Sequence, residues 1–245
     1  MVCAVRLLEE PDLLNPILIE GLPGIGFVAS IVTLHLIREL NARLFAEIKS
    51  SAFQDFSTST EDGNVLTPKN QLYYKKRGGG REDLVFLYGN TQALTSTGQY
   101  ELCGYILDLF QRFRGKTVVT LGGIHTPEVS MPPKVYCAAT DKETLEKAAA
   151  KGAFIIKGGQ IFGVAGLLIG LSKMRGIHGL CLLGETVGDS PDPEAALAVM
   201  KVLQDVVGLD AGLSGLDLRA KETSFLHEFI SKPYHTKGEK DYFLF

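Results

Sequence analysis

Ile17-Leu-Ile-Glu-Gly-Leu-Pro-Gly-Ile-Gly-Phe-Val-Ala29 runs on into an apolar segment ending at Leu40, and this stretch points to the class of the fold. Residues 17–20 predict a buried strand, because they form a short apolar run bounded by turn residues. Residues 24–40 predict a helix. A strand joined to a helix by a glycine-rich turn is the repeating unit of α/β folds, so the stretch favours that class.

The same alternation continues along the chain. Further strands are predicted at 44–53, 72–75, 84–88, 117–121, 135–139, 153–156 and 180–183. Further helices are predicted at 96–114, 141–150, 161–174, 193–207 and 216–230. An exposed hairpin tip is expected at 77–81. We therefore predict one α/β domain over residues 1–232, with a central, largely parallel sheet flanked by helices, and a flexible tail at 233–245.

Composition excludes several classes of protein. The 245 residues carry 25 Lys and Arg against 28 Asp and Glu, a formal net charge of −3. This balance argues against a nucleic-acid binder and a polybasic membrane-surface protein. Four cysteines without a C-x-x-C pair favour reduced, mostly buried thiols. With no signal peptide and no apolar run long enough to span a membrane, we predict a cytoplasmic protein.

A first glycine cluster leaves two interpretations open. Gly24, Gly26 and Ala29 fit the pattern G-x-G-x-x-A, and Glu47 follows at the distance where a dinucleotide fold would hold the ribose. Backbone N–H groups at such a turn can bind an anion. The alternative is a tight strand-to-helix turn that only glycine allows. Pro23, which removes a donor, is not typical of the dinucleotide motif.

A second cluster, Gly122-Gly123-Ile-His125, follows another predicted strand. Strand ends in α/β proteins often carry binding sites, so His125 with Glu128 is a candidate acid–base or ligand pair. A solvated or turn-stabilising histidine is the favoured interpretation of His125. Glu185 is the most site-like carboxylate, although it could equally hydrogen-bond loop amides. The candidate pocket residues are Gly24, Gly26, Gly122, Gly123, His125 and Glu185.

No catalytic set emerges from these residues. The chain has no G-x-S-x-G, no phosphate-binding G-x-x-x-x-G-K-[ST] and no metal-binding histidine spacing. These absences favour a binding protein over an enzyme, and we predict no catalytic residue, metal or cofactor.

A third cluster places Gly163, Gly166 and Gly170 on one face of a predicted helix. Because each glycine destabilises a helix by about 1 kcal/mol relative to alanine, the cluster predicts the close approach of another backbone. That backbone would belong to a neighbouring helix, strand or subunit. A ligand pocket beside this face of the helix is the less favoured alternative.

The C-terminal residues are unusual for a chain end. Tyr242-Phe243-Leu244-Phe245 follows a polar segment at 235–241 that contains a glycine. Three aromatic residues on a polar tether predict contact either with this protein or with another one.

Taken in order, the motifs resemble those of the family of the second proteasome assembly chaperone and its archaeal homologues. The resemblance covers about residues 15–215 and rests on segments 21–26, 122–127, 138–141, 158–163, 166–169 and 184–196. It implies a fold similar to nucleoside phosphorylases, a homo-oligomer, and a role in assembling the proteasome α-ring rather than catalysis. The implied partners are proteasome α-subunits or another protein client, with no nucleic acid and no membrane.

Archaeal members of this family can end in a hydrophobic–tyrosine–any motif that docks between α-subunits. Here leucine stands at position 244 where that motif has tyrosine, and Tyr242 lies two positions earlier. The resemblance still makes residues Tyr242, Phe243, Leu244 and Phe245 the candidate docking element. The competing hypothesis is an enzyme or sensor that binds a nucleoside or nucleotide at the glycine-rich strand ends.

Overall fold

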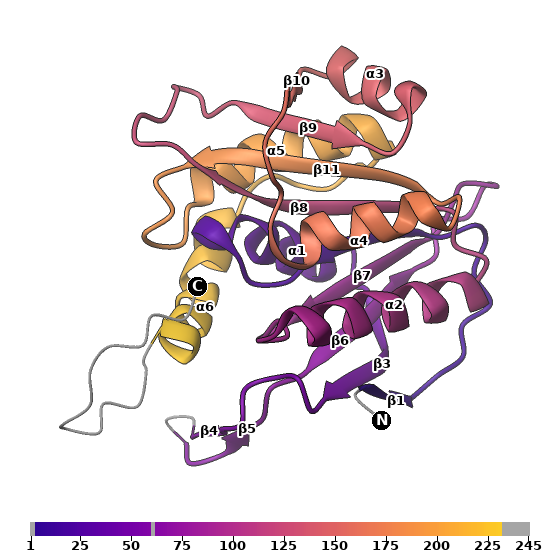
Figure 1. The fold of residues 1–245 in the computed structure, drawn as a ribbon, viewed down its shortest axis with the longest axis vertical. Helices are drawn as coiled ribbons and strands as arrows, with labels where there is room; N and C mark the ends of the chain where they lie inside the picture. Colours follow the sequence, from indigo (N-terminus) through magenta and orange to yellow (C-terminus); the bar gives the residue numbers. More distant parts are fainter. Residues whose placement is uncertain (1–2, 60–61, 232–245) are drawn as a thin grey trace.

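The structure is a computed structural model that describes residues 3–59 and 62–231, with the backbone alone described at 224–231. Within these ranges a nine-stranded sheet, in the order β1-β3-β6-β7-β2-β8-β11-β9-β10, forms the middle layer (Figure 1). Its strands are β1 (Cys3–Leu7), β2 (Ile17–Gly21), β3 (Arg43–Ser50), β6 (Asn70–Lys75), β7 (Leu84–Gly89), β8 (Thr117–His125), β9 (Val135–Ala139), β10 (Phe154–Ile155) and β11 (His178–Thr186).

The sheet is mixed, so the expectation of a largely parallel sheet is wrong. Its middle, β7-β2-β8-β11, is parallel, as is the short edge pair of β9 and β10. On one side β6, β3 and β1 pair antiparallel, and on the other β9 runs antiparallel to β11. The direct connection between β6 and β7 explains part of the difference, because two strands joined by a short loop pair antiparallel. That loop includes the predicted hairpin tip, and its glycines 78–80 are exposed.

Helices cover both faces of the sheet (Figure 1). One face carries α2 (Ser96–Arg112) and α4 (Gly163–Met174). The other carries α1 (Val28–Glu39), α3 (Lys142–Ala150), α5 (Pro193–Val207) and the first half of α6 (Leu216–Ser231). Strand β2 contributes to both cores, with Ile17 and Ile19 in one and Leu18 in the other. A strand buried on both faces explains the unbroken apolar run in its sequence.

Polar side chains set the starts of three helices. Thr95, Asp141 and Asp192 accept hydrogen bonds from Gly98 N, Thr144 N and Ala195 N at the beginning of α2, α3 and α5. Pro193 is the first residue of α5, as predicted, because proline needs no donor there.

The N-terminal part of the chain differs from the prediction in two ways. Helix α1 begins at Val28 rather than residue 24, because Gly26 and Phe27 have positive φ angles of 62° and 51° and residues 25–27 form a 3₁₀ turn. Strand β1 and the short hairpin of β4 (Thr58–Ser59) and β5 (Val65–Leu66) were not predicted. Strand β1 lies at the sheet edge and buries little of its length, so its sequence shows no strong alternation.

The glycines of α4 do not meet another element of the described chain, contrary to prediction. Among the described atoms, a Cβ at Gly170 would have no neighbour within 4 Å, and a Cβ at Gly163 would meet the Gln92 side chain. A Cβ at Gly166 would collide with the carbonyl of Ile161, which lies in the loop leading into α4. Close approach of a neighbouring subunit stays a prediction.

All four cysteines are free and buried, as the sequence predicted. Over the described ranges, none of the helices has the length and apolar character needed to cross a membrane.

Candidate functional site

The carboxyl ends of β2, β7, β8 and β11 meet at one edge of the sheet, where α/β proteins commonly bind ligands. Residues 21–27, which we call the glycine turn, connect β2 to α1 at this edge. The six residues proposed as a pocket lie at these strand ends or in the turn itself, so the topology does bring the predicted region together.

The glycine turn packs closely on its neighbours. A Cβ at Gly26 would lie 2.9 Å from Thr186 Oγ1, and a Cβ at Gly123 would collide with the carbonyl of Ile25. The Gly26 carbonyl also accepts a hydrogen bond from Asp192 N at 2.9 Å. Protein atoms from β8, β11 and the start of α5 thus fill the space beside Gly26. This arrangement fits the tight-turn interpretation of the motif.

The other two glycines of the predicted pocket face different surroundings. Gly24 is exposed, has an extended φ of −162°, and a Cβ there would meet no atom of the described residues within 4 Å. A Cβ at Gly122 would lie 2.9 Å from Cδ2 of Leu183, which belongs to the core between the sheet and helices α2 and α4. Gly24 and Gly122 therefore do not line one cavity with Gly26 and Gly123.

Glu185 anchors a loop. Its buried carboxylate accepts hydrogen bonds from Ser130 N (3.0 Å), Lys134 N (3.2 Å) and the Tyr136 hydroxyl (2.9 Å). Burial raises the pKa of Glu185, but the hydrogen bonds from Ser130, Lys134 and Tyr136 outweigh it and lower the pKa to about 2. The carboxylate is thus charged and fully engaged in holding residues 126–134 against β11.

His125 is tied to the opposite loop. Its Nδ1 lies 2.7 Å from the Val187 carbonyl, to which it donates, and the side chain is otherwise exposed. The structure shows no hydrogen bond or ion pair between His125 and Glu128 among its described residues. Over those same residues, no group of three or more His, Cys, Asp or Glu side chains is arranged to hold a metal ion.

Gln92, which no motif indicated, joins three elements at this edge. Its Nε2 donates to the Pro23 carbonyl at 2.6 Å, and its Oε1 accepts from Val164 N at 3.0 Å and from Gln99 Nε2 at 3.2 Å. The loop after β7 therefore fixes both the glycine turn and the start of α4. A single glutamine after a strand gives no sequence signal for such a role.

Glu20 lies directly before the glycine turn and is 1% exposed. Its Oε1 accepts a hydrogen bond from Leu22 N at 2.8 Å, whereas Oε2 has no partner in the described part of the chain. Burial raises the pKa of Glu20 to about 8, although the nearby backbone N–H groups of Leu22 and Leu121 act against it. The carboxyl group is therefore mostly protonated at neutral pH.

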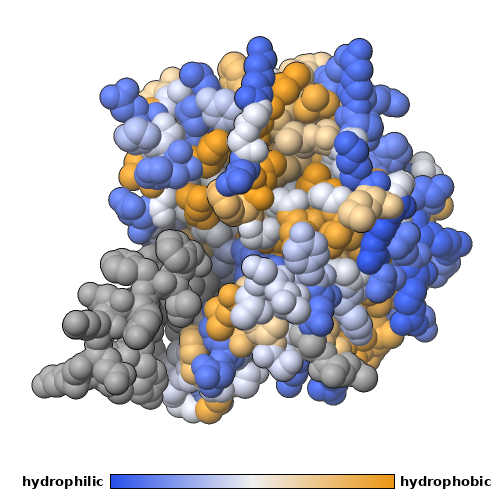
Figure 2. Space-filling model, in the orientation of Figure 1, coloured by the Kyte–Doolittle hydropathy of each residue, from blue (hydrophilic) through white to orange (hydrophobic). Residues whose placement is uncertain are grey.

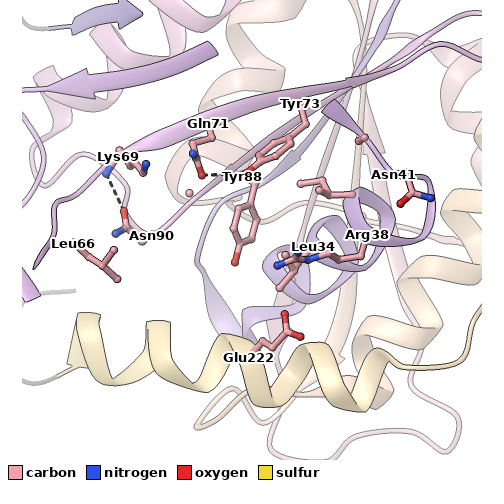
Figure 3. Close-up of a pocket in the computed structure, with 13 residues that line it drawn as sticks. Leu34, Arg38, Asn41, Leu66, Lys69, Gln71, Tyr73, Tyr88, Asn90 and Glu222 are labelled. Atoms are coloured by element: carbon pink, nitrogen blue, oxygen red, sulfur yellow. Dashed lines mark hydrogen bonds between the residues drawn. The ribbon is translucent and has the colours of Figure 1, made fainter. Parts of the chain in front are cut away.

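A separate pocket of about 510 Å³ opens between α1, the β6–β7 hairpin and α6 (Figure 3). We call it the tyrosine pocket. It is lined by Leu34, Ile37, Arg38, Asn41, Ala42, Leu66, Lys69, Gln71, Tyr73, Tyr88, Gly89, Asn90 and Glu222. Its volume lies within the range of sites that bind small molecules or side chains. None of these residues was singled out by the sequence, because they come from four separate segments.

The side chains at the centre of the tyrosine pocket converge. Figure 3 shows Arg38 from α1, Tyr88 from β7 and Glu222 from α6 directed toward one another. Burial raises the pKa values of Tyr73 and Tyr88, so both hydroxyls stay protonated at neutral pH. The Tyr73 hydroxyl donates to Gln71 Oε1 at 3.2 Å. The pocket thus combines an aromatic floor with a polar, charged rim.

The predicted docking element, residues 242–245, lies outside the described residues.

Comparison with known proteins gives a consistent picture. The model of the PAC2 family matches residues 18–226. Among solved structures, PbaB of Pyrococcus furiosus, described as an archaeal proteasome activator, is 36% identical, with 94% of this chain and 99% of that chain covered and a TM-score of 0.83. PbaA of the same organism, described as an archaeal homologue of proteasome-assembly chaperone, is 27% identical, with 93% and 98% covered and a TM-score of 0.76.

One curated relative adds sequence similarity without a described activity. An uncharacterised protein of Methanocaldococcus jannaschii is 34% identical over 219 residues, which cover 89% of this chain and 83% of the relative. The similarity to PbaA and PbaB extends over nearly the whole of all three chains.

Proposed function

The chain belongs to the PAC2 family, and on that basis we propose that it is a non-enzymatic, proteasome assembly chaperone-like protein that binds proteasome α-subunits. The observation that carries the proposal is the similarity to PbaA and PbaB along almost the entire chain. At this identity and coverage a shared class of partner is the simplest expectation.

We place the contact with α-subunits in residues 242–245. Tyr242, Phe243 and Phe245 offer aromatic side chains that anchor well in pockets between subunits, and the polar segment before them supplies reach. Because position 244 is leucine, docking would depend on the aromatic neighbours instead of a penultimate tyrosine.

Binding to purified α-subunits tests this contact. The full chain is expected to retain α-subunits on an affinity column, whereas a chain ending at Asp241 loses most of that binding. A full-length control with His235→Ala keeps the aromatic residues and is expected to bind like the unaltered chain. Unchanged binding after truncation would remove the tail from the proposal, and no binding by either chain would remove the partner.

The proposed homo-oligomer has support on the face that carries α4. Figure 2 shows hydrophobic residues exposed on this face. Phe162, which directly precedes α4, and Met174, the last residue of α4, are 76% and 83% exposed. Monomers seldom leave large apolar patches uncovered, so a second copy is the proposed cover.

Light scattering tests that surface. A Phe162→Asp and Met174→Asp double variant is expected to have a lower molar mass than the unaltered chain, while Leu218→Asp, at an exposed apolar position on α6, leaves the mass unchanged. A double variant with the unaltered mass would exclude the two ends of α4 from the interface.

A second candidate function is activation of the assembled proteasome, which the similarity to PbaB, an archaeal proteasome activator, favours. Assembly and activation are distinguished by the starting material of the assay, which is separate subunits for assembly and complete proteasomes for activation. An activator raises substrate hydrolysis by proteasomes that are already complete, whereas an assembly factor changes the yield of complete particles from separate subunits.

The nucleoside- or nucleotide-binding alternative has weaker support, because protein atoms fill the space beside Gly26 and Gly123. The likeness to the nucleoside phosphorylase fold stays a prediction. A thermal-shift screen addresses the binding alternative, since a ligand at 100 times its dissociation constant stabilises a protein by about 2.7 kcal/mol. No shift with any nucleoside or nucleotide would count against it.

A further inference from the structure

One charged residue of the tyrosine pocket has no ion-pair partner among the side chains that the structure describes. Of its three charged residues, Lys69 pairs with Glu47 at 2.7 Å and Glu222 pairs with Arg219. Arg38 has no ion pair among the side chains that the structure describes, and it is exposed at the rim. A guanidinium that pairs with no described carboxylate and lies beside an aromatic floor suits an occupant that carries a carboxylate next to aromatic side chains.

The floor of the pocket is suited to aromatic side chains in particular. Tyr73 and Tyr88 lie on neighbouring strands, and Leu34 and Ile37 of α1 form an apolar wall beside them. Aromatic pairs with offset or edge-to-face geometry add to the gain from burial. A strongly polar ligand would leave these apolar groups unmatched.

The chain contains a segment of matching composition. Asp241 directly precedes Tyr242-Phe-Leu-Phe245, so that one carboxylate adjoins three aromatic side chains. The same helix that lines the pocket at Glu222 leads into this segment.

The distances are compatible with a return of the segment to the pocket. From Glu222 to the end of α6 at Ser231 the helix advances about 14 Å. The ten residues from 232 to 241 can span at most about 36 Å when extended. That length is more than twice the advance of the helix, so Asp241 can reach Arg38 without any change in the described fold.

We propose that residues 241–245 of this chain dock in its own tyrosine pocket, with Asp241 paired to Arg38 and aromatic side chains packed on Tyr73 and Tyr88. The inference holds whether or not these residues also bind α-subunits. If they do, the two contacts are mutually exclusive, and docking holds the segment back until a partner competes for it.

The absence of tryptophan from the sequence allows a specific test. A Phe243→Trp variant of the full chain places a single tryptophan in the segment. Its emission is expected to be blue-shifted, with several-fold weaker quenching by iodide than in a free peptide of residues 232–245 carrying the same change.

Charge exchange tests the pocket. Arg38→Glu in the Phe243→Trp chain is expected to bring emission and quenching to the values of the peptide, and adding Asp241→Arg is expected to restore the shielded signal. Lys173→Glu, an exposed charge change on α4, serves as the control and is expected to change neither. Circular dichroism verifies that each variant folds.

Three results would overturn the proposal. Emission and quenching equal to those of the peptide in the Phe243→Trp chain would show that the segment does not dock. A shielded signal unaffected by Arg38→Glu would place the segment elsewhere. A shielded signal that disappears on dilution would assign it to the tail of a second copy. Binding to α-subunits is measured in a separate assay. If the chain does not bind α-subunits, the fluorescence results still test whether the segment docks in the pocket.

Discussion

The glycine turn and the tyrosine pocket differ in how much open space they contain, and the sequence motifs do not predict this difference. The glycine turn carries the most recognisable motif of the chain, yet protein atoms fill the space beside Gly26 and Gly123. The tyrosine pocket carries no motif, yet it encloses about 510 Å³ and displays an arginine without an ion pair among the described side chains. A glycine motif can therefore indicate close backbone packing, whereas an open pocket can form without any recognisable motif in the sequence.

The greatest change in stability is expected from Glu20, which tests whether the region behind the glycine turn excludes water. Because its pKa is raised from 4.5 to about 8, the folded chain binds a proton that the unfolded chain releases. Stability conferred by the protonated group is complete below about pH 4.5 and falls as the pH rises to about 8, by about 5 kcal/mol in total.

Urea unfolding across this pH range measures the effect. Glu20→Gln, which stays neutral, is expected to lack this decrease and to become increasingly more stable than the unaltered chain as the pH rises. Parallel pH profiles for the two chains would mean that Glu20 is hydrated, and would break the contrast between a filled turn and an open pocket.

The next effect has the opposite sign and concerns Glu185. Because its pKa is lowered to about 2, its stabilisation is complete above pH 4.5 and is lost as the pH falls toward 2, by about 3 kcal/mol. Acid unfolding of Glu185→Gln is expected to lack this loss, while Glu143→Gln on the exposed face of α3 keeps it. A normal acid profile in the unaltered chain would show that the loop at 126–134 is not anchored as described.

Two glycines, one from each of the first two glycine clusters, form a matched pair in which only one substitution is expected to destabilise the chain. Gly123→Ala places a Cβ against the Ile25 carbonyl and is expected to destabilise the chain by about 2 kcal/mol. Gly24→Ala faces open space at an extended φ and is expected to change stability by less than about 0.5 kcal/mol. Equal effects in denaturant unfolding would remove the packing explanation for the motif.

The least change in stability is expected in the tyrosine pocket. Arg38→Ala removes an exposed side chain without an ion pair among the described side chains, and is expected to change the unfolding free energy by less than about 0.5 kcal/mol. The same substitution is expected to release the tail in the fluorescence assay. A large loss of stability would give Arg38 a structural role and weaken the distinction between the two regions.

Local signals in the sequence predict much of the fold. The α5 helix at 193–207 matches its prediction because Asp192 and Pro193 mark its start and an αL glycine, Gly208, follows its end. The directions of the strands on either side of the parallel strands β7-β2-β8-β11 could not be predicted in the same way. Pairing of β3 with β6, or of β9 with β11, depends on contacts between segments far apart in the chain.

The sequence predicted where the candidate site lies, but it did not predict which atoms surround its residues. The motifs around Gly26, Gly123, His125 and Glu185 do gather at the carboxyl edge of the parallel strands, as strand-end placement suggests. Whether a glycine faces a phosphate or a carbonyl is decided by atoms brought from other elements. For the same reason Gln92 and the Arg38–Tyr73–Tyr88 group gave no signal, since each depends on tertiary contacts between separate segments.

Reconstitution of proteasomes from separate α- and β-subunits, with and without the chain, measures whether this PAC2 family protein assists their assembly. We expect a higher rate or yield of α-rings and complete particles when the full chain is present, and a smaller gain with the chain that ends at Asp241. Identical rates and yields with and without the chain would show that it is not an assembly factor.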